Sequence, residues 1–416
     1  MREIAKRPDE VRGLSDLLFG ELARAIGGIA AIHRGIAQRA FGGTGPGGRP
    51  AQLAHDAIST GVYALLRSGA GLVGRGAGAA LELRAPGDGR ELSTSPRGSA
   101  VIAAINGLVG DVLEREDSDL QEPMSVRVKG RPVTPEPVAL TKAFPRATPR
   151  LVVFVHGLME TEHAWRLGTD ETGETYASRL SRDLGCTPVH VRYNSGRHIS
   201  ENGRSLSELL GALVESWPVE VEQIHLIGHS MGGLVSRSAC HYGSAEDVEW
   251  VSGVRHVVSL GSPHMGAPLE QIVHLASAGL DALPEVRPFG SFLRRRSAGI
   301  RDLRHGSLVD EDWRDRDRDA LRAAAITEVP LLDGAMHCFV AATVTSSPKH
   351  PLGRLVGDVL VLEPSASGRA RDRRIPFRAE HGMHVGGTHH LALLNHPEVY
   401  GQLRDWLATE PAAAGV

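Results

Sequence analysis

Cysteine is scarce in this chain of 416 residues, which holds only Cys186, Cys240 and Cys338. An odd and widely spaced set excludes a disulfide framework of the kind that holds small secreted domains together. None of the three lies in a Cys-x-x-Cys pair. The sequence therefore predicts reduced and mostly buried thiols without a nucleophilic role.

Long uncharged runs are also missing, and charge of one sign does not dominate. No uncharged stretch reaches the roughly 18 residues that a membrane-spanning helix needs, and no secretory apolar stretch follows the charged residues 1–10. The formal net charge of −3 gives no reason to expect nucleic-acid binding. We expect a cytoplasmic protein, with peripheral contact to lipid as the alternative, and the sequence leaves the oligomeric state unknown.

The first 121 residues carry apolar stripes at helical spacing. The stripes occupy residues 11–41, about 58–73 and 101–113, and loops rich in glycine or polar residues separate them. We interpret them as a helical accessory layer that packs on the next domain, outside the chemistry. A surface that docks on lipid or a partner is the alternative, although the stripes lack a cationic flank with aromatic residues.

The pattern changes near residue 122, where short apolar runs begin to alternate with helical stretches. Continuous apolar runs without alternation are typical of buried parallel strands. They occur at 151–155, 189–191, 224–227, 256–260 and 339–343. This alternation predicts an α/β domain over residues 122–408, with a mostly parallel, doubly wound sheet and helices on both faces.

The stretch at about 266–328 is too long for a plain connection between two strands. It combines apolar residues with a charged run at 310–315. We expect it to form a helical lid over the site. Residues 409–416 are predicted to be a disordered tail.

The strongest motif is Gly228-His229-Ser230-Met231-Gly232, which follows the apolar run 224–227 and precedes a helix-forming run. In a Gly-x-Ser-x-Gly turn the serine lies on a sharp strand-to-helix reversal, so the flanking positions must be small. The turn exposes the serine oxygen and directs the N-terminus of the helix at a developing oxyanion. Ser230 is therefore the candidate nucleophile, and the N–H of Met231 is one candidate oxyanion donor.

The surroundings of Ser230, together with Phe154-Val155-His156-Gly157-Leu158-Met159, resemble bacterial lipases of the α/β-hydrolase superfamily and its GPI inositol-deacylase-like branch. The run 260–266 and the run beginning at His390 are similar to further motifs of these families. The resemblance covers about residues 123–407. It implies an α/β-hydrolase fold and a Ser-His-Asp triad, with the N–H of Leu158 as the second oxyanion donor.

The triad order Ser, acid, His places the acid in a late loop. Asp358 lies where related lipases carry their acid, and the competing carboxylates are Asp310, Asp312, Asp333 and Glu363. His-x-x-Leu-Leu spacing selects His390 as the base, with His389 as its rival. The polar loop 192–204 is interpreted as bracing the fold rather than framing the pocket.

The sequence implies no cofactor and no catalytic metal, because the histidine-rich run 381–396 matches no zinc spacing. The function expected from the resemblance is carboxylic-ester hydrolysis of lipase or esterase type on a small ester or lipid. A serine acyltransferase or amidase using the same triad is the first alternative. A lipid-binding or scaffolding protein with an idle triad is the second.

Overall fold

The computed structural model describes residues 92–169, 173–267, 297–314, 326–348, 350, 357–358, 360–371 and 373–410. The chain divides into two compact units, and one of them comprises Ser93–Val112, Glu122–Gln271 and Ser297–Val416. We call it the sheet unit, and it contains the features below apart from Leu92 and residues 113–121. The helices predicted at 11–41 and 58–73 lie outside the described residues, as does the predicted tail from 411 onward.

Eight strands form one sheet in the order β2-β1-β4-β3-β5-β6-β7-β8. Strands β3 to β8 pair in parallel, whereas β1 is antiparallel to both β2 and β4. The strands are β1 Ser125–Val128, β2 Arg131–Val133, β3 Arg150–Val155, β4 Thr187–Arg192, β5 Gln223–His229, β6 Val254–Leu260, β7 Met336–Thr343 and β8 Gly382–Gly386. The prediction of a mostly parallel α/β sheet is therefore confirmed.

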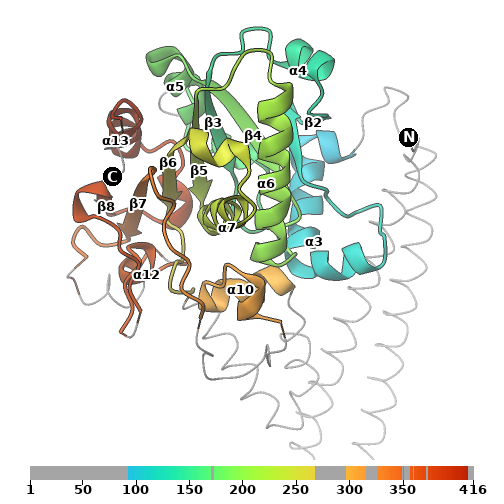
Figure 1. Ribbon diagram of the computed structural model, residues 1–416. Coiled ribbons are helices and arrows are strands. Elements are labelled where there is room, and N and C mark those ends of the chain that lie inside the picture. The colour runs from blue at the N-terminus through green and yellow to red at the C-terminus, as the bar shows by residue number, and fades with distance from the viewer. Residues whose placement is uncertain are drawn as a thin grey trace, which may run out of the picture. The chain divides into compact units, whose positions relative to one another are not determined.

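Helices cover both faces of the sheet (Figure 1). The α-helices are α3 Pro96–Arg115, α4 Pro137–Ala143, α5 Tyr176–Leu184, α6 Ile199–Ser216, α7 Met231–Ala245, α10 Ala298–His305, α12 Glu363–Ala366 and α13 Pro397–Leu407. Shorter 3-10 turns are η2 Leu92–Thr94, η3 Glu162–Arg166, η4 Glu249–Gly253, η5 Asp310–Asp312, η6 Ala379–His381 and η7 His390–Leu393.

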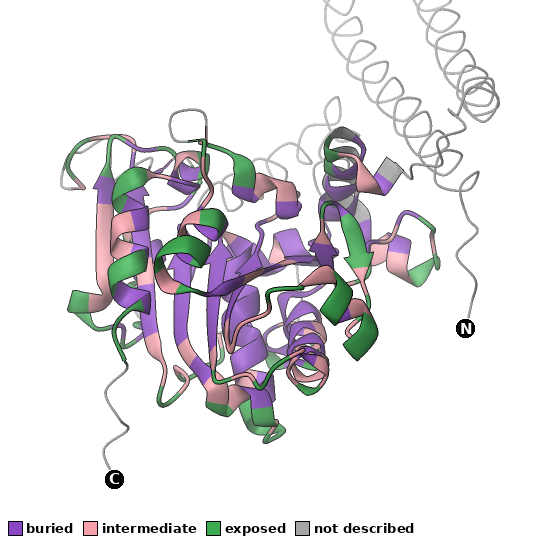
Figure 2. Cartoon of the chain, turned by 90° about the horizontal axis from the view of Figure 1, so that it is seen from above, coloured by how far each residue is buried: buried purple, intermediate pink, exposed green. Residues whose placement is uncertain are grey.

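The two faces of β3 show how the sheet builds its core. Val153 and Val155 pack in the cluster that contains residues of α6 and α7, whereas Val152 and Phe154 pack with residues of α5 and α13. Successive side chains of a strand point to opposite faces, so a strand covered on both sides must be apolar at every position. Figure 2 shows the resulting buried layer through the central strands.

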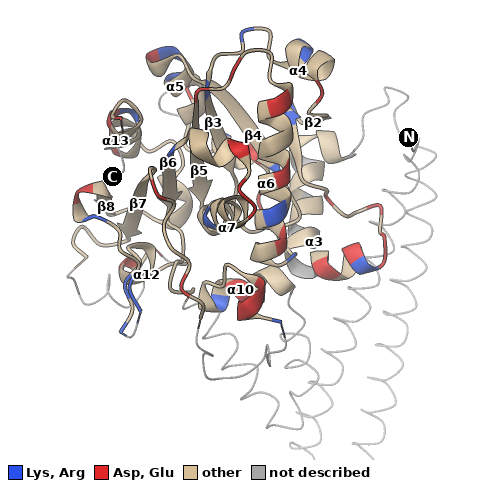
Figure 3. Ribbon diagram, in the orientation of Figure 1, with Lys and Arg blue, Asp and Glu red and all other residues tan. Residues whose placement is uncertain are grey.

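Charged side chains are concentrated on helices and loops, and the central strands carry few of them (Figure 3). Local signals explain the helix limits. Thr175 and Ser178 form a capping box at the start of α5, and Gly185 ends that helix in the left-handed conformation. None of the helices in the described part of the chain is both long and apolar enough to cross a membrane.

Two segments bear on the predicted domain boundaries. Helix α3 forms where the third stripe predicted a helix, and its residues up to Val112 lie in the sheet unit. The accessory role of residues 1–121 stays a prediction. Within the insert at 266–328, α10 and η5 are described. Its function as a lid stays a prediction too.

Candidate active site

Ser230 lies at the turn between β5, which ends at His229, and α7, which begins at Met231. Its backbone has φ 53° and ψ −120°, a region that a residue with a side chain occupies only under strain. The backbone N–H of Ser230 donates to the carbonyl of Leu260 at 2.8 Å, which anchors the turn to β6. The elbow predicted from the sequence motif is therefore present.

The glycines of the motif are required by close backbone contacts. A Cβ atom at Gly232 would lie 2.1 Å from the carbonyl oxygen of Val155, and one at Gly228 would lie 2.3 Å from the carbonyl carbon of Gly232. Both distances are well inside van der Waals contact, so any side chain would push α7 away from the sheet. The small residues thus keep the helix N-terminus directly behind the serine.

Asp358 and His390 form a buried pair. The Asp358 carboxylate Oδ2 lies 2.7 Å from His390 Nδ1, and the two side chains are 1% and 4% exposed. The other carboxylate oxygen accepts the N–H groups of Leu360 and Val361, and the N–H of His390 donates to the Asp358 carbonyl. Since a carboxylate only accepts, Nδ1 carries the proton and Nε2 keeps its lone pair.

The structure places the rival residues elsewhere. His389 is exposed, as is Asp333. The carboxylate of Asp310 pairs with Arg204, and that of Asp312 accepts backbone N–H groups from Leu308 and Thr327. Glu363 pairs with Arg369. Among the described candidates, the acid and the imidazole that face each other are Asp358 and His390.

His390 lies next to the elbow. Its ring is 4.8 Å from the ring of His229, the residue that precedes Ser230. Gly261 directly follows β6, the strand that anchors Ser230. A Cβ atom built at this glycine would lie 3.1 Å from His390 Cε1. Within the described part of the chain, His390 Nε2 is buried and has no hydrogen-bond partner. This nitrogen is the one that a general base would use.

The loop after β3 leaves the N–H of Leu158 unused. The N–H of Gly157 donates to Glu160 Oε2 at 2.7 Å, and the N–H of Met159 donates to Ser195 Oγ at 3.0 Å. No hydrogen bond among the described residues uses the N–H between them. The N–H of Met231, at the first position of α7, has no acceptor within its own helix.

Two residues of the site were not singled out by the sequence analysis. Glu160 and His229 form a hydrogen-bonded pair, with Glu160 Oε2 3.0 Å from His229 Nδ1. Burial alone lowers the pKa of His229, but the charge and the hydrogen bond of Glu160 outweigh it and the pKa is raised. Burial raises the pKa of Glu160, while the charge of His229 and its hydrogen bond lower it, with a net decrease. Each shift favours the charged form of its residue.

Helix α3 packs against the same loop. A Cβ atom built at Gly107 would lie 2.2 Å from Met159 Cγ. The carbonyl oxygen of Gly107 accepts a hydrogen bond from the hydroxyl of Ser297. One turn further, the carbonyl of Gly110 accepts Asn194 Nδ2 at 2.9 Å. Met159 itself has φ 60°. A glycine face of α3 thus supports the strained loop that carries Leu158, and Asn194 in the loop 192–204 contributes bracing contacts.

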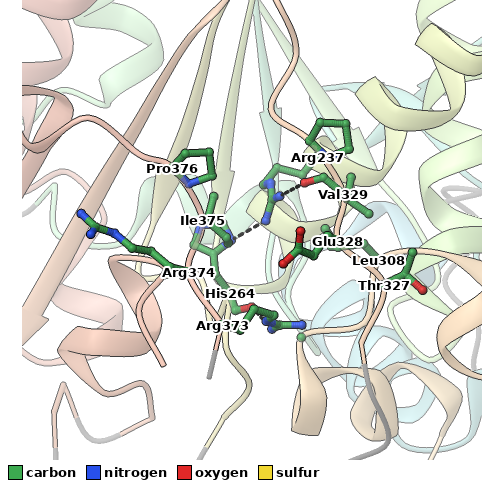
Figure 4. A pocket seen from close by; sticks show the side chains of 12 residues that line it. Arg237, His264, Leu308, Thr327, Glu328, Val329, Arg373, Arg374, Ile375 and Pro376 are labelled. Atoms are coloured by element: carbon green, nitrogen blue, oxygen red, sulfur yellow. Dashed lines mark hydrogen bonds between the residues drawn. The ribbon is translucent and has the colours of Figure 1, made fainter. Parts of the chain in front are cut away.

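A separate cavity of about 320 Å³ is lined by residues of α7 and of the segments around 306–308, 327–330 and 373–376 (Figure 4). It includes none of the five predicted site residues. Its buried Arg237 donates through Nη2 to the carbonyl of Val329 at 2.9 Å. Burial, and then the charge of Arg373, lower the pKa of Arg237 to about 10.

In the described residues, no group of three or more His, Cys, Asp or Glu could hold a metal ion.

The mostly parallel sheet and the strand-to-helix elbow together give an α/β-hydrolase-like fold. Residues 146–278 match the family described as PGAP1-like alpha/beta domain. This match begins before β3 and includes the loop with Leu158, the Ser230 elbow and the end of β6. The matched segment is similar to that family, in agreement with the resemblance noted in the sequence.

Solved structures similar to this chain include bacterial lipases. The mature form of Bacillus licheniformis lipase BlEst2 is 19% identical over 68% of this chain and 99% of its own, with a TM-score of 0.41. Its propeptide form is 19% identical over 65% of this chain and 52% of its own length, with a TM-score of 0.42. This chain therefore spans about half of the length of the propeptide form. Staphylococcus hyicus lipase is 15% identical over 62% of this chain and 95% of its own, with a TM-score of 0.35. No curated protein sequence matches the chain.

Proposed function

We propose that this chain is a serine carboxylic-ester hydrolase of lipase or esterase type. The observation that carries the proposal is the buried Asp358–His390 pair, which lies beside the strained Ser230 elbow. Among the described residues, His390 Nε2 has no hydrogen-bond partner. A nucleophilic hydroxyl needs an adjacent base whose orientation a third group fixes. The buried pair beside the elbow supports the assignment of these roles to Ser230, His390 and Asp358.

In the proposed reaction, His390 Nε2 accepts the proton of Ser230 Oγ as the oxygen bonds to the acyl carbonyl carbon. The N–H groups of Leu158 and Met231 donate to the oxyanion of the tetrahedral intermediate. The intermediate collapses by breaking the ester C–O bond, and His390 protonates the departing alcohol. His390 then deprotonates a water molecule that attacks the acyl-enzyme, and the carboxylic acid leaves as Ser230 regains its proton.

The proposed substrate is a small ester or a lipid. Met159, in the oxyanion loop, and Met265, after β6, are half-buried apolar side chains suited to contact with an acyl chain. Water is the acceptor in the proposed reaction. An assay with added alcohols separates hydrolysis from acyl transfer, because a transferase would form the new ester in preference to the free acid.

The test compares wild type with Ser230→Ala on 4-nitrophenyl esters of graded chain length. Removing a triad nucleophile is expected to lower kcat on the order of 10⁶-fold while the unfolding temperature stays close to that of wild type. A fluorophosphonate probe should label the wild type and leave Ser230→Ala unlabelled. Activity of Ser230→Ala within about tenfold of wild type would contradict the proposal.

A further inference from the structure

One buried ion pair joins three loops of the site. The Glu160 carboxylate accepts the N–H of Gly157 at 2.7 Å and lies 3.0 Å from His229 Nδ1. The other ring nitrogen of His229 lies 3.4 Å from the carbonyl oxygen of His390. Two side chains, those of Glu160 and His229, thus connect three segments. These are the oxyanion loop after β3, which carries Leu158, the elbow at Ser230 and the segment that begins at His390.

The partners of His229 determine its protonation state. A carboxylate and a carbonyl are both acceptors, so hydrogen bonds to both require a proton on each ring nitrogen. His229 is 0% exposed, and a buried imidazolium is stable only beside a negative charge. Among the described residues, the groups that act on its charge are Glu160, Asp358 and the carbonyl of His390, and the rings of His390 and Trp165 lie nearby.

We propose that Glu160 and His229 are positioning residues for the ester hydrolysis proposed above, on which this inference rests. Glu160 holds Gly157, so that the adjacent N–H of Leu158 stays directed at the oxyanion. His229 ties the backbone of His390 to the elbow, so that Nε2 stays within reach of Ser230 Oγ. Neither side chain touches substrate in this scheme, and their effect is on the geometry of the groups that do.

The decisive variant is Glu160→Gln, because an amide keeps the shape and the acceptor oxygen but removes the charge. We expect kcat to fall about 10- to 100-fold with little change in KM, since small displacements of reacting groups cost rates of this size. The pH profile should also change. In wild type, the charge of Glu160 raises the pKa of His229, so kcat should keep a plateau into alkaline pH. In Glu160→Gln that charge is gone and burial lowers the pKa of His229. A decline in kcat should therefore appear at lower pH than in wild type, as His229 loses its proton.

Replacing His229 as well isolates the origin of that decline. The double variant Glu160→Gln with His229→Gln has no imidazole at position 229, so its profile should return to a plateau although its kcat stays low. His225→Gln is the matched control. His225 is a buried histidine of the same strand, but its ring pairs with His256 rather than with the oxyanion loop. It should lose stability at most and keep the wild-type kcat and profile.

The result that would overturn the inference is a Glu160→Gln variant with wild-type kcat and a plateau at high pH, or an equal loss in His225→Gln. The kcat values of Glu160→Gln and His225→Gln are compared with that of Ser230→Ala. If Ser230→Ala is inactive while Glu160→Gln behaves as wild type, the positioning role fails and the proposed function stands. If Ser230→Ala remains active, the proposed function itself fails.

Discussion

At the scale of single residues, burial distinguishes His390, which the motif spacing selects, from its neighbour and rival His389. His390 is buried against Asp358, whereas His389 is exposed to solvent. An exposed imidazole has no fixed tautomer and no oriented lone pair. This difference in burial between neighbouring positions favours His390 over His389 as the proposed base.

The first prediction compares His390→Ala with His389→Ala. Loss of the base should lower kcat by several orders of magnitude, because the Ser230 hydroxyl would lack a proton acceptor. His389→Ala should keep kcat within about twofold of wild type, since its side chain is exposed. Steady-state kinetics on one ester measures both variants. The reverse ranking would move the base to position 389.

The sequence could predict residues whose role depends on local spacing, and it missed those that depend on distant pairing. The flanking glycines point to Ser230 as the candidate nucleophile, and chain order and resemblance point to Asp358 and His390 as the candidate acid and base. Glu160 looks like an ordinary loop carboxylate, and His229 occupies a variable position of the motif. Their contact spans 69 positions of the chain, so spacing gave no signal for it.

At the scale of elements, α3 packs against the loop after β3, which carries Leu158. The interpretation that residues 1–121 lie outside the chemistry rests on their helical stripes, on the lack of a motif and on the position of the catalytic candidates after Val155. The glycine face of α3 at Gly107 nevertheless packs against Met159, next to Leu158. A stripe of apolar residues predicts a helix, but it does not show which loop the helix will support.

The second prediction concerns Gly107→Leu. Its side chain would overlap Met159, where a Cβ atom alone would approach within 2.2 Å, and should displace the oxyanion loop. We expect kcat to fall about 10- to 100-fold, together with slower fluorophosphonate labelling. Gly401→Leu on α13 is the control, because a Cβ atom there meets nothing within 4 Å. Equal kcat in the two variants would show that α3 does not position the loop.

The strands illustrate what element-level patterns determine. The apolar runs at 151–155, 224–227, 256–260 and 339–343 all fall within strands of the sheet. Two-sided burial makes such strands continuous in hydrophobicity and easy to predict. Strand β8 is a short edge strand with partly exposed residues, and its sequence carries no comparable run, so it was not predicted.

At the scale of the whole molecule, buried histidines make stability depend on pH. Burial lowers the pKa of His156 to about 4, that of His256 to about 4 and that of His337 to about 3. The unfolded chain binds protons at these positions below about pH 6.5, whereas the folded chain does not. Stability should therefore decrease as pH falls from about 6.5 toward 4.

The third prediction is quantitative. Each of these three histidines should lower the free energy of unfolding by roughly 2 kcal/mol between pH 7 and pH 5. Urea unfolding at the two pH values measures the change. His337→Gln keeps an acceptor for the N–H of Leu332, which His337 Nε2 accepts at 2.9 Å, and should make the pH dependence smaller. An unchanged dependence in this variant would contradict the assignment for His337.

The scarcity of cysteine has a practical consequence for spectroscopy. All three thiols are buried, and burial raises the pKa of each of them, so thiolate, the form that reacts with maleimides, is nearly absent at neutral pH. The native chain should therefore take up no maleimide on the time scale of labelling. Val138→Cys on α4, where the native side chain is 84% exposed, should accept one label, as counted by mass spectrometry. Dyes or spin probes could then report on this fold without first removing its own cysteines.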